Sequence, residues 1–142
     1  MAPRLFRRRG TVVEVCMNDE GRAFVRGVFE QVVASERDPE HVWHIGLVAP
    51  IDPTRDADDP LAVLRRQTDT MSNAELALAS VTADSLTLAE AWAWFSTLQV
   101  GLRSVAAQAG IHTDQQWAEL AGPARETIEG LQIIQGNLAD SL

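Results

Sequence analysis

The sequence predicts a mainly α fold in which one domain, residues 1–142, begins with a short β-hairpin at 4–17 and continues as a bundle of six to seven helices at 19–139. Three observations favour this fold class. A chain of 142 residues is long enough to bury one core of its own. Apolar residues recur at helical spacing along most of the chain. Helix-start residues follow short connections, which favours antiparallel neighbours in a bundle.

The hairpin is predicted from the opening stretch, PRLFRRRGTVVEV. The valines at 12, 13 and 15 favour a strand, and Leu5 and Phe6 can pair with them across a turn. Gly10 supplies the positive φ that a tight turn requires. Arginines around the turn would be solvated and would oppose edge-to-edge association. An export signal is not expected, because Glu14 interrupts the apolar run.

Two helices are predicted in the first half of the bundle. A helix over 19–35 begins with Asn18 or Asp19 as its N-cap, and its apolar residues form a broad stripe. An Asp-Pro dipeptide follows, with the spacing of an N-cap and a proline in the first turn. It predicts a short helix over 40–47.

The second half of the chain carries further helix-start signals. Residues 60–84 favour helix, and the capping-box spacing of Ser72 and Glu75 leaves open whether they form one bent helix or two. A second capping box begins the longest predicted helix, 88–109, which Gly110 ends. A third begins a short helix that reaches residue 120, and a Gly-Pro pair separates it from a last helix that ends near residue 138.

The composition excludes several kinds of chemistry. All twelve basic residues are arginine, so no lysine is available for a Schiff base or a phosphate-binding P-loop. The one cysteine, Cys16, cannot form an internal disulfide, and no apolar run reaches the length of a membrane span. These features predict a cytoplasmic protein that does not associate with a membrane.

Two stretches contain residues that could bind a metal ion. His41 and His44 stand at i, i+3, but no spacing motif nominates a third ligand among the acids and histidines nearby. The acidic loop at 52–59 fits a calcium-binding loop in neither register, because one lacks the required glycine and glutamate and the other meets Pro60. No catalytic or cofactor motif is present. The sequence therefore predicts no metal, no cofactor and no enzyme activity.

The stretch LAEAWAWFSTLQVGLRSVAAQAG carries two apolar stripes on one predicted helix. Either neighbours bury both stripes or one stripe is left for a partner. The last predicted helix has a further apolar edge. Because monomers rarely leave such patches in water, the sequence predicts a protein partner and a twofold homodimer. The interaction surface is expected among five residues: Trp92, Trp94, Leu98, Ile133 and Ile134.

The alternative hypothesis is a nucleic-acid-associated transcriptional regulator. Its basic patch would consist of Arg4, Arg7, Arg8 and Arg9. The rest of the chain has eight arginines against twenty acids, so its formal charge is 8 − 20 = −12. A body of that charge repels a phosphate backbone, which makes nucleic-acid binding the less favoured hypothesis.

Several stretches, in order, resemble one known family. They are the arginine-flanked hairpin, DDPLAVLRRQT, LAEAWAWFSTLQVGLRSVAAQAGI and LQIIQGNLADSL. Over nearly the whole chain they resemble the actinobacterial domain-of-unknown-function family numbered two thousand and seventeen, although Gln99-Val100 stands where that family usually has Asn-Asp. The resemblance implies a small, uncharacterised helical protein of the cytoplasm with no assigned activity. It also implies a function accessory to Clp-type regulated proteolysis.

Overall fold

The computed structural model describes residues 4–38, 40, 60–111 and 113–142. This part of the chain is mainly helical, with a small antiparallel sheet at its N-terminal end, as the sequence predicts. In chain order the elements are β1 (Phe6–Arg9), β2 (Val12–Val15), α1 (Asp19–Arg37), α4 (Pro60–Ala79), β3 (Ser85–Thr87), α5 (Leu88–Gln108), α6 (Asp114–Glu119) and α7 (Pro123–Asp140).

The number of helices differs from the prediction. The described residues form five helices rather than six or seven. The short helix expected over 40–47 lies outside the described residues. The segment 60–84 contains one helix, α4, because no glycine or proline interrupts it after Pro60. Ser72 does not cap a helix, since the residues before it are already helical.

The predicted hairpin is confirmed, and it belongs to a sheet of three strands with the order β1-β2-β3. β1 pairs with β2 in antiparallel register, with Phe6 opposite Val15 and Arg9 opposite Val12. Gly10, in the two-residue connection, has a φ of 60°, as the turn requires. The third strand, β3, was not expected from the sequence. Three residues with one apolar side chain, Leu86, carry too short a pattern to be recognised.

The core lies where the inner face of the sheet meets the helices. Four sheet residues are buried on that face: Phe6, Val13, Val15 and Leu86. Behind them lies Trp94 of α5, which is fully buried. Its ring meets Phe6 at 6.1 Å between ring centroids and Phe29 of α1 at 5.2 Å, both in edge-to-face geometry. The indole N–H donates to Ser80 Oγ at 2.9 Å, just after α4. Trp94 thus joins the sheet to three helices.

Three helix starts are capped as the sequence predicts. Asn18 Oδ1 accepts from the backbone N–H of Gly21 at the start of α1. Reciprocal capping boxes begin α5, at Thr87 and Glu90, and α6, where the N-cap is Thr113. Each box pairs two backbone groups that a helix start otherwise leaves without partners.

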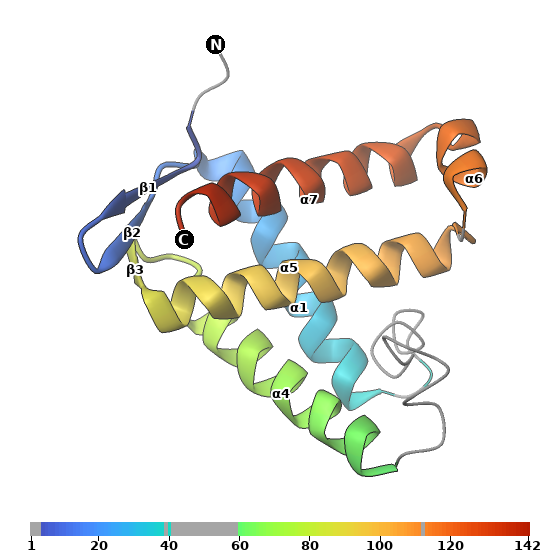
Figure 1. The fold of residues 1–142 in the computed structure, drawn as a ribbon, viewed down its shortest axis with the longest axis horizontal. Helices are drawn as coiled ribbons and strands as arrows, with labels where there is room; N and C mark the ends of the chain where they lie inside the picture. The colour runs from blue at the N-terminus through green and yellow to red at the C-terminus, as the bar shows by residue number, and fades with distance from the viewer. Residues whose placement is uncertain (1–3, 39, 41–59, 112) are drawn as a thin grey trace.

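α5 is the central helix of the arrangement. It packs against α4, α1 and α7, and α7 returns antiparallel beside it (Figure 1). In the same view α1 crosses behind α5 and α7, while the sheet and α6 lie at opposite ends of α5. One side of α5 therefore faces the core, and the other faces outward beside α7.

The turn glycine offers a direct test of the hairpin. Gly10→Val places a β-branched residue at a φ of 60°, so we expect a loss of about 1–2 kcal/mol in the free energy of unfolding, measured by urea denaturation. Gly27→Ala is the matched control. Gly27 lies inside α1 with open space at its Cβ position, so alanine there is expected to add about 0.5–1 kcal/mol. A Gly10 variant as stable as wild type would contradict the turn geometry.

Candidate interaction face on the α5 helix

The five residues expected at an interaction surface separate into two groups. Trp94, Leu98 and Ile134 are buried in the core. Trp92 and Ile133 are the two that reach the surface, with exposed fractions of 53% and 59%. The two predicted stripes of α5 therefore differ in burial. The stripe that contains Trp94 faces the sheet and α1, whereas the stripe that contains Trp92 faces outward.

The Trp92 stripe runs along the outer side of α5. Trp92 packs edge-on against Phe95, one turn further along, with ring centroids 5.8 Å apart. Gln99, Leu102 and Ala106 continue the stripe, and each is exposed or half-buried. Because the exposed indole packs against Phe95, the position of the indole is restricted before any partner binds.

The same stripe leads into a groove of about 560 Å³ between α5, α6 and α7. Its lining is mixed, with five apolar and three polar residues, and the polar residues come from the α6 end and from α7. The lining residues are Leu102, Ala106, Ile111, Thr113, Asp114, Trp117, Ile128 and Gln132. Beside the groove, Gln135 Nε2 of α7 donates to Gln99 Oε1 at 2.6 Å, which holds α5 and α7 together.

The α6 wall of the groove is fixed by Arg125. Its guanidinium lies 4.8 Å from the centroid of the Trp117 ring. It also donates to the carbonyl oxygens of Trp117, at 3.1 Å, and Leu120, at 2.9 Å, and pairs with Glu129. These contacts satisfy the C-terminal carbonyls of α6 and hold a six-residue helix that buries no residue of its own. The groove is therefore pre-formed.

Ile133 has different surroundings. Its neighbours one turn away on α7 are Glu129, Gly130, Gly136 and Asn137. None of them is a large apolar residue, so Ile133 is a single exposed side chain rather than part of a patch. Isolated apolar residues of this kind are ordinary on protein surfaces.

The predicted basic patch is partly used within the chain. Arg8 Nε donates to the carbonyl oxygen of Gly10 at 2.6 Å, and Arg9 pairs with Glu14 at 2.8 Å. Arg4 and Arg7 are exposed. Two of the four guanidinium groups thus stabilise the hairpin and its turn, and nucleic-acid binding by this patch stays a prediction.

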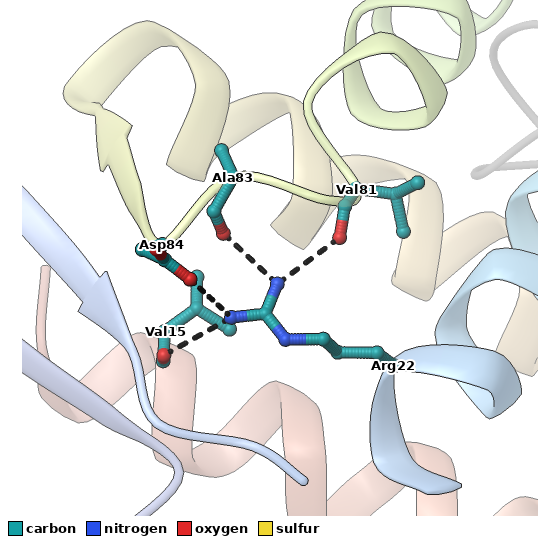
Figure 2. Close-up of polar contacts among 5 residues, drawn as sticks. All are labelled: Val15, Arg22, Val81, Ala83 and Asp84. Atoms are coloured by element: carbon teal, nitrogen blue, oxygen red, sulfur yellow. Dashed lines mark hydrogen bonds and ion pairs between the residues drawn. The ribbon is translucent and has the colours of Figure 1, made fainter. Parts of the chain in front are cut away.

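A second hollow is lined by two arginines and two aspartates, and one of the arginines, Arg22 of α1, has a structural function there. The Arg22 guanidinium donates to the carbonyl oxygens of Val15, Val81 and Ala83 and reaches the Asp84 carboxylate at 3.5 Å (Figure 2). With these acceptors the side chain is only 20% exposed. Arg22 therefore fastens α1 to the end of β2 and to the segment between α4 and β3.

The metal hypotheses concern residues outside the described part of the chain. His41, His44 and the acidic loop at 52–59 all lie there. Among the residues that are described, no group of three or more His, Cys, Asp or Glu side chains could hold a metal ion. Within the same residues, no helix has the length and hydropathy needed to cross a membrane.

Comparison with known proteins gives no relative. No protein-family profile, curated protein or solved structure matches the chain. The resemblance to the domain-of-unknown-function family therefore stays a prediction, as do the activity and partners that it implies.

The structural function of Arg22 can be tested by substitution. Arg22→Met keeps the aliphatic stem but leaves three backbone carbonyls without their donor, so we expect a loss of about 1–3 kcal/mol in the free energy of unfolding. Arg26→Met, one turn along α1 at an exposed position in the same hollow, is expected to change it by less than about 0.5 kcal/mol. Equal effects of the two substitutions in thermal or urea denaturation would contradict this assignment.

Proposed function

We propose that this chain is a non-enzymatic, cytoplasmic protein-interaction module that self-associates through the outer face of α5. The observation that carries the proposal is the exposed indole of Trp92, which packs against Phe95 on the same side of α5 as a pre-formed groove. Large aromatic side chains that are already restricted in position are the typical anchors of protein interfaces.

The charge pattern of α5 supports the same proposal. The whole chain has 23% charged residues, but no residue from Ala91 to Leu102 is charged. The outer side of the helix in this span is nevertheless exposed or half-buried. A solvated helix face usually carries charged residues, whereas the centre of an interface is depleted of them.

The lack of charged residues on this face also favours a second copy of the chain over a highly charged partner. Two copies with a net charge of −8 each repel one another, so their contact is most favourable where charged groups are few. The outer face of α5 meets this requirement. A function accessory to Clp-type proteolysis, which the family resemblance implies, remains a second proposal for this face.

We expect the chain to form a dimer whose dissociation constant depends on Trp92. We expect sedimentation of the wild-type chain at micromolar concentration to give twice the monomer mass of 15.5 kDa, with dissociation on dilution. Trp92→Gln should raise the dissociation constant about 30-fold or more, because it removes an aromatic anchor from both copies. The substitution leaves the buried core unchanged.

Ile133→Gln is the matched control. It also replaces an exposed apolar residue with glutamine on a helix, and its exposed fraction is similar. We expect it to leave the dissociation constant within a factor of about three. The proposal is contradicted if the wild-type chain stays monomeric across about a hundredfold dilution range. It is also contradicted if the Ile133 variant dissociates as readily as the Trp92 variant.

A further inference from the structure

We infer that the partner of the α5 face is a second copy in antiparallel orientation, with Trp92 of each copy inserted into the α5–α6–α7 groove of the other. This inference rests on the proposed function and gives the dimer a specific geometry. It follows from the position of a projecting side chain and a groove on the same helix.

Trp92 and the groove lie on one side of α5. The floor of the groove includes Ala106, fourteen residues after Trp92. Fourteen residues correspond to almost four helical turns, so the two positions share one side of the helix and lie about 21 Å apart along its axis. The midpoint between them is Gln99, which is exposed.

A twofold axis beside Gln99 brings these features together. Rotation about that axis makes two α5 helices antiparallel and places residue 92 of one copy opposite residue 106 of the other. Because the operation is symmetric, both indoles meet both grooves at once. The projecting residue and the groove are thus self-complementary, which a closed twofold interface requires.

The groove matches an indole in chemistry as well as in position. Leu102, Ala106 and Ile128 provide apolar contacts for the ring. The indole N–H of Trp92 has no hydrogen-bond partner within the described part of the chain. The groove supplies acceptors from the Asp114 carboxylate and the amide oxygen of Gln132.

Disulfide trapping tests the orientation. In a Cys16→Ser background, Gln99→Cys puts one thiol per copy beside the twofold axis, where the two helices are closest. We expect mild oxidation to convert most of this variant to a covalent dimer. Ala89→Cys, ten residues earlier on the same helix, is the control, because its two thiols would lie about 30 Å apart along the helices.

Mixing two variants tests the insertion of Trp92. Trp92→Ala removes the projecting side chain but keeps the groove, and Ala106→Phe fills the groove but keeps Trp92. Each alone should dimerise at least about 100-fold more weakly than wild type, since both contacts are lost. Mixed in equal amounts, they should form a heterodimer in excess of either homodimer by native mass spectrometry, because one intact contact is restored.

The outcomes separate this inference from the proposed function. A wild-type dimer that cross-links through Ala89→Cys rather than Gln99→Cys, or variants that show no preference for the heterodimer, overturn the antiparallel geometry and leave self-association intact. A wild-type monomer overturns both. If Ala106→Phe does not fold, as judged by thermal denaturation, Gln132→Phe fills the groove from its exposed rim and replaces it in the mixture.

Discussion

The burial of Trp94 constrains most of the described structure. An indole enclosed on all sides must still satisfy its N–H, because an unpaired buried donor costs about 1–3 kcal/mol. Ser80 supplies the acceptor, and it can do so only when α4 ends beside α5. The ring edges also require Phe6 from the sheet and Phe29 from α1. One side chain thus determines which elements meet, and in particular which side of α5 faces inward.

The orientation that Trp94 imposes has a consequence for function. Trp92 is two residues away, about 200° around the helix, so it must face outward when Trp94 faces inward. The resulting outer face combines an exposed tryptophan packed against a half-buried phenylalanine, a stretch without formal charge and a groove whose α6 wall is held in place by Arg125. The fold therefore uses one side of α5 for stability, and we propose that it uses the other for association.

Local signals explain what could be predicted from the sequence. The turn at Gly10 and the caps at Asn18, Thr87 and Thr113 depend on residues within a few positions, and all four were recognisable. Contacts between distant residues explain what could not. Trp92 and Trp94 both lie on apolar stripes, and only the sheet and α1 decide which stripe is buried. The groove likewise depends on α7 returning beside α5 and on α6 lying at their shared end, and no short motif encodes that arrangement.

The most direct test of this division between the two sides of α5 is the solvent exchange of the tryptophan indole protons, followed by nuclear magnetic resonance as a function of protein concentration. We expect the Trp94 indole proton to exchange slowly at every concentration, because it is buried and donates to Ser80 Oγ. The Trp92 proton should exchange rapidly in dilute solution and become protected as the protein associates. Rapid exchange at Trp94, or exchange at Trp92 that does not change with concentration, would show that the two sides of α5 are not divided between core and association.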